Sequence, residues 1–185
     1  MTIETASGIK ELELFTRNSK VSSVTVNMGK AQFNPQEIPA LLDGERIISK
    51  PISVAGREYE ITCVSVGNPH CVVFVDNVDN INIEETGPKF ETAEIFPERI
   101  NTEFVRVVNN RTIKMRIWER GNGETQACGT GACAAAIAAV ENGFCSKGVD
   151  ITVKLRGGDL IVNYTDEAVT LTGDCNLVFT GDIEY

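Results

Sequence analysis

The chain has 185 residues, 42% of them hydrophobic and 23% charged, and a formal net charge of −9 at pH 7. These values are typical of a globular protein with one large or two small domains, and they exclude disordered and collagen-like chains. No apolar run approaches the ~20 residues that span a bilayer, and residues 1–5 lack the character of a secretory signal. Because the basic residues are scattered, nucleic-acid binding is not expected. We therefore expect a cytoplasmic protein without membrane or nucleic-acid partners.

Strands dominate the predicted secondary structure. In the first of them Val24, Val26 and Met28 alternate with polar residues, as in a strand with one buried face. Further strands are predicted over residues 57–66, 71–75, 103–108, 113–117, 149–155, 160–164, 169–172 and 177–180. Gly157 and Gly158 predict a hairpin turn between two of these strands.

Two helices are also expected. Residues 83–92 form the weaker candidate, because Gly87 and Pro88 interrupt the segment near its middle. Residues 130–142 are mostly alanine, the best helix former, and Gly143 follows as a C-terminal cap. The middle of this helix carries no polar side chain, which is typical of a buried helix. The pattern predicts an α+β fold, in which a curved, mostly antiparallel, barrel-like sheet wraps around a central alanine-rich helix.

The six cysteines predict neither a disulfide framework nor a metal site. Their spacings are irregular, no C-x-x-C pair occurs, and the chain has a single histidine. Free thiols in a reducing compartment are the simplest interpretation, and no metal or other cofactor is expected. Without a motif around them, most of the cysteines are interpreted as core residues, namely Cys63, Cys133, Cys145 and Cys175.

The most informative segment is the glycine-rich stretch of residues 119–133, which leads into the alanine-rich helix. The free N–H groups and the dipole of a helix N-terminus bind anions, here a phosphate or a carboxylate. Cys128 lies at this end, where the pKa of a thiol is expected to fall. Beside a carboxylate site, such a thiol indicates chemistry at the α-carbon of an amino acid. For each residue taken singly, the alternative interpretation is structural: Cys128 would be a small packed residue, and Glu119 with Arg120 would form a solvated strand end.

A second polar cluster, residues 67–71, closes one predicted strand and opens another. It contains the single histidine, His70, which could orient or deprotonate a thiol. Its neighbour Cys71 is an unfavourable partner, because adjacent residues of a strand point to opposite faces. The alternative is a loop histidine with satisfied hydrogen bonds, and for Asn101, which precedes another strand, a turn residue.

Together these motifs resemble the diaminopimelate epimerase family of cofactor-independent amino-acid epimerases. The resemblance covers essentially the whole chain, and its residues are Met28-Gly29, Gly67-Asn68-Pro69-His70, Phe96-Pro97 ahead of Asn101, and the run from Glu119 to Gly131. It implies two similar lobes, each a curved sheet around a central helix, with the active site in the cleft between them. Two cysteines, one in each lobe, would act on opposite faces of the substrate α-carbon.

The resemblance also implies roles for individual residues. Cys128 corresponds to the catalytic cysteine of the second lobe, Glu119 would set its protonation, and His70 would support the thiol of the other lobe. The implied substrate-binding residues are Gly129 and Thr130 for the α-carboxylate, Glu119 for the α-ammonium group, and Asn68, Asn101 and Arg120 for the distal end.

One part of the family pattern is missing: the cysteine of the first lobe has no counterpart in this sequence. We therefore expect residues 1–28 to be remnant strands of that lobe, residues 29–173 the complete second lobe, and residues 174–185 a strand returning to the first. The full-length parent would interconvert LL- and meso-diaminopimelate for lysine and cell-wall precursors, whereas this chain is expected to be inactive without its missing N-terminal lobe. Unpaired strand edges also favour a homodimer.

Two other functions stay open. Proline racemases and hydroxyproline epimerases share the implied fold and chemistry, but Asn68, Asn101, Glu119 and Arg120 favour a substrate with a charged distal end. A non-catalytic domain that grips an amino-acid carboxylate is the alternative of another class. Cys128→Ser would distinguish them, because a binding domain keeps its affinity whereas an enzyme loses turnover.

Overall fold

The computed structural model describes residues 1–5 and 8–184. The strands in this part of the chain are β1 (Thr2–Thr5), β2 (Gly8–Arg17), β3 (Lys20–Gly29), β4 (Lys50–Val54), β5 (Arg57–Ser65), β6 (Pro69–Phe74), β7 (Asn101–Asn109), β8 (Thr112–Glu119), β9 (Gly123–Glu124), β10 (Ile151–Leu155), β11 (Gly158–Tyr164) and β12 (Val169–Asp174). The helices are α1 (Ile83–Glu91) and α2 (Gly129–Glu141), with a 3-10 turn at Val78–Asn80. No described helix is both long and apolar enough to span a membrane.

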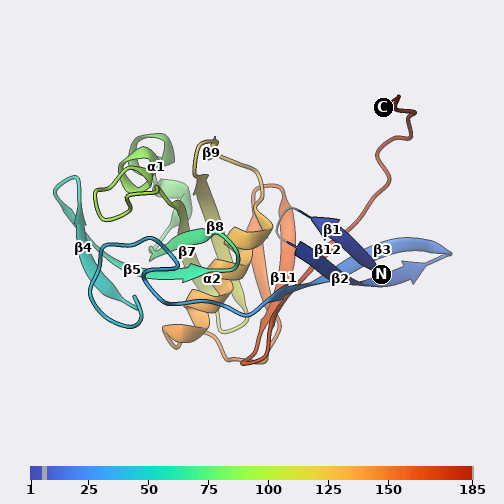
Figure 1. The fold of residues 1–185 in the computed structure, drawn as a ribbon, viewed down its shortest axis with the longest axis horizontal. Helices are drawn as coiled ribbons and strands as arrows, with labels where there is room; N and C mark the ends of the chain where they lie inside the picture. The colour runs from blue at the N-terminus through green and yellow to red at the C-terminus, as the bar shows by residue number, and fades with distance from the viewer. Residues whose placement is uncertain (6–7, 185) are drawn as a thin grey trace.

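The twelve described strands form one mixed sheet in the order β1-β2-β3-β12-β11-β10-β8-β7-β6-β5-β4, with β9 paired to β8. Neighbouring strands are antiparallel except in the pairs β6–β7 and β8–β10. The sheet curves around α2 but does not close, and β1 and β4 are its two ends (Figure 1). The fold is therefore α+β, as predicted, with an open rather than a closed barrel.

The alanine-rich helix α2 lies at the centre of this curved sheet. It contacts β5, β6, β7 and β8 on one side and β10, β11 and β12 on the other, and every residue of the segment 131–139 is buried. Small side chains permit this arrangement, because a Cβ on Gly129 would lie 2.9 Å from Cδ2 of Leu171. The sequence prediction of a helix without a solvent-facing side is confirmed.

Two buried clusters lie on opposite faces of the strands β5–β7. Val64 belongs to the cluster around α2, whereas its neighbour Cys63 belongs to the cluster beneath α1. The second cluster contains the aromatic pair Phe90 and Phe104, whose ring centroids are 5.6 Å apart. Each strand here therefore has two dry faces, which is why its sequence shows long apolar runs.

Helix α1 differs from its prediction, because Gly87 and Pro88 do not interrupt it. Proline removes one backbone donor. The carbonyl of Pro88 still accepts two hydrogen bonds, from the N–H and from the hydroxyl group of Thr92. Gly87 is needed for packing rather than for a turn, since a Cβ there would lie 2.4 Å from the indole ring of Trp118. The helix therefore continues through both residues and rests on β8.

The predicted strands between residues 57 and 172 are confirmed, and so is the hairpin at Gly157 and Gly158, which joins β10 to β11. The strand predicted over 177–180 is wrong: residues 175–184 have no regular secondary structure and run away from the sheet (Figure 1). The last ladder bond joins the N–H of Cys175 to the carbonyl of Ser22. Leu177, Val178 and Phe179 beyond it are each more than 80% exposed, because no described strand continues there to pair with them. The division of the chain at residues 28 and 174 stays a prediction.

Candidate functional site

The candidate site is built at the N-terminus of α2, where Cys128 is the capping residue. Cys128 has extended backbone geometry, and its sulfur accepts the N–H of Gly131 at 3.4 Å. The hydroxyl oxygen of Thr130 lies at the same distance, 3.4 Å, from Sγ. Within the described part of the chain, the N–H groups of Gly129 and Thr130 have no protein acceptor. A half-buried thiol thus lies beside two free backbone donors, which suits a carboxylate next to a reacting carbon.

The pKa of Cys128 departs from the sequence expectation. Partial burial raises the pKa of this thiol above its ordinary value, and this effect outweighs the hydrogen bonds from Thr130 and Gly131, which lower it. The carboxylates of Glu103 and Glu119 raise it further. The lowered pKa expected at a helix N-terminus is therefore wrong, because neighbouring strands remove the sulfur from water and bring negative charge near it.

A chain of hydrogen bonds connects His70 to Cys128. Nδ1 of His70 lies 2.6 Å from Oε1 of Glu103, and Nε2 lies 3.0 Å from Oδ1 of Asn68. The amide nitrogen of Asn68 donates to the hydroxyl oxygen of Thr130 at 3.3 Å, and that hydroxyl contacts the sulfur of Cys128. Two motifs that the sequence analysis singled out separately are therefore brought together, and a further residue, Glu103, joins them.

Glu103 is the member of this network that the sequence analysis missed. Its side chain is completely buried, and its Oε2 has no hydrogen-bond partner among the described residues. Burial raises the pKa of this carboxyl group, although the charge and the hydrogen bond of His70 oppose the rise. Glu103 lies in the buried first half of β7, and buried carboxylates are rare unless they are paired; its sequence neighbours alone did not reveal this burial.

Cys71 does not take part in this site. It pairs with Cys63 across the β5–β6 ladder, within the cluster beneath α1. Burial raises the pKa of the Cys71 thiol well above its ordinary value, and a hydrogen bond with Cys63 adds to the rise. Both ring nitrogens of His70 already have other partners, so a nucleophilic His70–Cys71 pair is absent, in agreement with the opposite directions of adjacent strand residues.

Asn101 holds two loops of the site against each other. Its amide nitrogen donates to the carbonyl of Pro69 at 2.8 Å, and its Oδ1 accepts the N–H of Arg120 at 2.9 Å. Because these two bonds engage both ends of a buried amide, Asn101 fixes the position of Arg120 relative to residues 67–70. The guanidinium group of Arg120 itself is exposed and donates to the carbonyl of Glu98.

The turn after β8 orients Glu119. Gly121 and Gly123 adopt φ angles of 80° and 82°, which only glycine takes readily, and β9 folds back so that Glu119 pairs with Gly123. The hydroxyl group of Thr125 donates to Oε1 of Glu119. Glu119 thereby presents a half-buried carboxylate near Cys128, which suits an ammonium group next to the reacting carbon.

Two further carboxylates, those of Glu91 and Glu124, form hydrogen bonds that stabilise this turn. Glu91 of α1 accepts the indole N–H of Trp118 at 2.6 Å and the N–H of Gly121 at 3.0 Å. Glu124 forms two hydrogen bonds with Arg116, at 2.7 and 3.1 Å. Glu91 lies outside every motif, and Glu124 lies in the glycine-rich run without a role assigned to it, so the interactions that stiffen the turn could not be found from spacing alone.

Among the described residues, all six cysteines are free and no group of three or more His, Cys, Asp or Glu side chains could hold a metal ion. The groups that the structure brings together at this site are side chains and backbone donors of the chain itself. A thiol, two free backbone donors and a nearby carboxylate can bind the two charged groups of an amino acid and exchange a proton at its α-carbon.

Solved structures with similar folds include a hydroxyproline epimerase. A hydroxyproline epimerase from Agrobacterium vitis matches with a TM-score of 0.66 and 16% identity, over 94% of this chain and 55% of that one. A protein from Pseudomonas aeruginosa that is described as a predicted epimerase matches with a TM-score of 0.61 and 18% identity, over 97% and 66% of the two chains. At these identities the likeness shows the fold alone.

Sequence relatives are more informative. The diaminopimelate epimerase of Geobacillus sp. (strain WCH70) is 46% identical over 99% of this chain and 65% of its own length. That of Acetivibrio thermocellus is 47% identical over 98% and 65%, so the chain spans about two thirds of the length of these relatives. The sequence profile described as Diaminopimelate epimerase matches residues 62–178. The chain belongs to the diaminopimelate epimerase family.

Proposed function

We propose that this chain forms one half of the active site of an epimerase that interconverts LL- and meso-diaminopimelate without a cofactor. The observation that carries the proposal is the position of Cys128, whose sulfur lies at the N-terminus of α2 beside the free N–H groups of Gly129 and Thr130. The names of the relatives support diaminopimelate as the substrate. The activity of the whole enzyme is part of the proposal, because the chain spans 65% of those relatives.

In the proposed mechanism the two backbone donors bind the α-carboxylate, and Glu119 binds the α-ammonium group. The Cys128 thiolate removes the α-proton, and the electron pair of the broken C–H bond moves into the carboxylate, whose charge Gly129 and Thr130 stabilise. A second acid then protonates the opposite face of the carbon. In the reverse direction the Cys128 thiol donates the proton.

The second acid does not come from another described cysteine at this site. Four of the remaining cysteines are buried, and Cys175 lies beyond the end of β12. We therefore assign the second thiol to the part of the family's chain that has no counterpart in these 185 residues. The proposal accordingly includes a partner, the missing lobe, and predicts that this chain alone does not interconvert the two isomers.

The test follows the α-proton signal of LL-diaminopimelate by NMR in D₂O, together with the formation of the meso isomer. This chain is assayed alone and with a polypeptide that carries the remaining third of a curated relative. We expect conversion only in the mixture, its loss on Cys128→Ser, and its retention in the matched control Cys175→Ser.

Four results would contradict the proposal in different ways. Conversion by the chain alone would refute the need for a second lobe, and conversion that survives Cys128→Ser would refute the role of that thiol. Turnover of proline or hydroxyproline by the mixture, without turnover of diaminopimelate, would favour the racemase alternative. Tight binding of the amino acid without any proton exchange would favour a non-catalytic binding domain.

A further inference from the structure

Glu103 combines two properties that few carboxylates share. It is completely buried, and one of its oxygens, Oε2, makes no hydrogen bond among the described residues. Its other oxygen lies 2.6 Å from Nδ1 of His70, in the range of a charge-assisted bond. Leaving a charged group half-satisfied in a core is costly. A residue of this kind therefore calls for an explanation beyond packing.

The directions of the neighbouring hydrogen bonds supply an explanation for the buried carboxylate of Glu103. The amide nitrogen of Asn68 donates to the hydroxyl of Thr130, so its Oδ1 must accept a proton from Nε2 of His70. Because the Thr130 oxygen already accepts from Asn68, its own hydrogen is available to the sulfur of Cys128. Every bond from His70 to Cys128 therefore donates toward the sulfur, and the N–H of Gly131 donates to it as well.

This order holds only while Nε2 of His70 carries a proton. A short contact between Nδ1 and a carboxylate oxygen requires one shared proton, held either by the imidazole or by the carboxyl group. Because Oδ1 of Asn68 can only accept, Nε2 also carries a proton. The pair therefore has no net charge, either as a carboxyl group beside a neutral imidazole or as a carboxylate beside an imidazolium. Burial raises the pKa of Glu103, which favours retention of the shared proton.

We infer that Glu103 is a positioning residue for Cys128: by sharing a proton with Nδ1 of His70, it fixes Nε2 as a donor and keeps the relay through Asn68 and Thr130 directed at the thiol. The relay stabilises the thiolate that the proposed epimerisation needs, so the inference deepens that proposal and rests on it for its purpose. Its geometry does not depend on the identity of the substrate.

The charges around the relay come from several elements. Glu103 of β7 faces His70 of β6, Glu119 of β8 and Cys128 at the start of α2. Cys71 of β6 is also within electrostatic range of Glu103, and Cys133 of α2 is within range of Cys128. Glu119 is the one carboxylate of this set without a cationic partner among the described residues. Both carboxylates, Glu103 first, raise the pKa of Cys128 and so oppose the relay.

Packing places the pair directly beneath the helix. A Cβ on Gly131 would lie 2.9 Å from Oε1 of Glu103 and 2.7 Å from Cδ1 of Ile117. The first turn of α2 can therefore rest on the Glu103–His70 pair only because residue 131 is glycine. The carboxylate, the imidazole and the capped thiol thus form one close-packed unit.

The test measures the reactivity of Cys128 without any substrate. The rate of alkylation by iodoacetamide is followed across pH, with each cysteine-containing peptide resolved by mass spectrometry. In Glu103→Gln the amide can satisfy either tautomer of His70, so Nε2 is no longer held as a donor. We expect alkylation of Cys128 at neutral pH to slow about three- to tenfold, the effect of losing one hydrogen bond to sulfur.

The sign of the change distinguishes the two explanations. If Glu103 acted as an unpaired anion beside the thiol, its removal would speed alkylation, and that result would overturn the inference. An unchanged rate would also overturn it, because the relay would then not reach the sulfur. The half-exposed Cys175 serves as an internal control, and Glu58→Gln, an exposed carboxylate on β5, as the matched variant.

Two further measurements keep the test independent of folding defects and of the epimerase proposal. Thr130→Val removes the last donor, so Glu103→Gln should slow alkylation no further in that background; additive effects would contradict a single relay. Because the chain has one histidine, ¹⁵N-histidine NMR of the wild-type protein reports His70 alone. We expect a protonated Nε2, and a bare Nε2 would refute the relay whether or not the protein epimerises diaminopimelate.

Discussion

The backbone of Gly87 in α1 lies directly on the indole ring of Trp118 in β8, so that a Cβ at residue 87 would be 2.4 Å from the ring carbons Cγ and Cδ2. The same helix also binds the edge of the ring, because Nε1 of Trp118 donates to Glu91. The contact fixes α1 against the strand that leads into the candidate site. It also identifies a substitution, Gly87→Ala, for which the sign of the change in the free energy of unfolding is diagnostic.

At an exposed helical position, alanine in place of glycine stabilises a protein by up to about 1 kcal/mol. For Gly87→Ala we expect the opposite, a loss of about 1–3 kcal/mol in the free energy of unfolding, because the indole ring must move. Urea unfolding measures the change. Glu84→Ala, an exposed residue of the same helix, should change the free energy by less than about 0.5 kcal/mol; equal effects of the two variants would contradict the close contact.

Glu91 should matter more than its position outside every motif suggests. Replacing it with alanine leaves the N–H groups of Trp118 and Gly121 without their acceptor, and we expect a loss of about 2–3 kcal/mol. Amide exchange at Gly121 should quicken in the variant, because the turn that carries Arg120 is no longer held. Stability loss with unchanged exchange at Gly121 would show that Glu91 supports α1 alone.

The ion pair of Glu124 predicts that the free energy of unfolding decreases as the pH falls. Hydrogen bonds from Arg116 outweigh the effect of burial and hold the pKa of Glu124 below its ordinary value of 4.5. A carboxyl group whose pKa is lower in the folded state stabilises that state above the unfolded pKa, and this contribution is lost as pH falls through the folded value. Unfolding midpoints between pH 7 and pH 3 should therefore fall more steeply for the wild type than for Glu124→Gln. Parallel profiles would contradict this contribution.

The cysteines should divide into two classes by reactivity. Burial raises the pKa of Cys133 to about 12, and Cys63, Cys71 and Cys145 are also buried. In the native protein we expect a thiol reagent to modify Cys128 and Cys175 first, and the other four only after denaturation in urea. Rapid modification of Cys133 in the native state would show that α2 opens locally.

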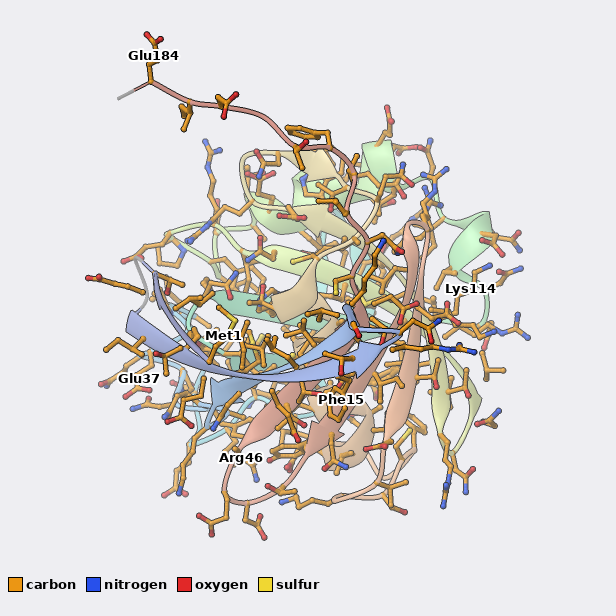
Figure 2. The ribbon with its side chains drawn as sticks, turned by 90° about the vertical axis from the view of Figure 1, so that its right-hand side faces the viewer. Met1, Phe15, Glu37, Arg46, Lys114 and Glu184 are labelled. Carbon is orange, nitrogen blue, oxygen red and sulfur yellow. The ribbon has the colours of Figure 1, made fainter. Side chains whose placement is uncertain are left out.

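Self-association remains a prediction that the fold makes easy to test. Figure 2 looks onto the end of the molecule formed by β1, β2 and β3, where Met1 and Phe15 lie near the free edge and Glu184 ends the extended tail. Ile9 is 73% exposed on β2, and strand β1 has no further partner among the described strands. We expect a dimer in sedimentation at high protein concentration, weakened by Ile9→Lys. A monomer at all concentrations would refute the dimer.

Strong local composition made parts of this fold predictable. The alanine content of α2 and the alternation of β8 are decided by nearby residues, and both were predicted in place. Strand β2 was expected only through the resemblance, as part of the remnant strands of residues 1–28 and without bounds of its own, because most of its residues are exposed. The strand over 177–180 was wrong because β-pairing needs a partner strand, which apolar composition does not provide.

The candidate site was predictable only where residues lie close in the sequence. Cys128 and Thr130 share one motif, so their contact was foreseeable. The bond between His70 and Glu103 spans 33 residues, and it depends on the parallel pairing of β6 with β7, in which His70 lies opposite Asn101. The pKa of Cys128 depends likewise on burial by distant strands, which no spacing reveals.

The central position of α2 has a consequence for the order of folding. An isolated helix of 13 residues is marginal in water even when it is rich in alanine, and the strands that enclose α2 range from β5 to β12. The free N–H groups at its first turn therefore acquire fixed positions only after segments more than a hundred residues apart have come together. Hydrogen exchange in α2 should then report global unfolding, and the ability to bind a carboxylate should appear in a single late step together with the sheet.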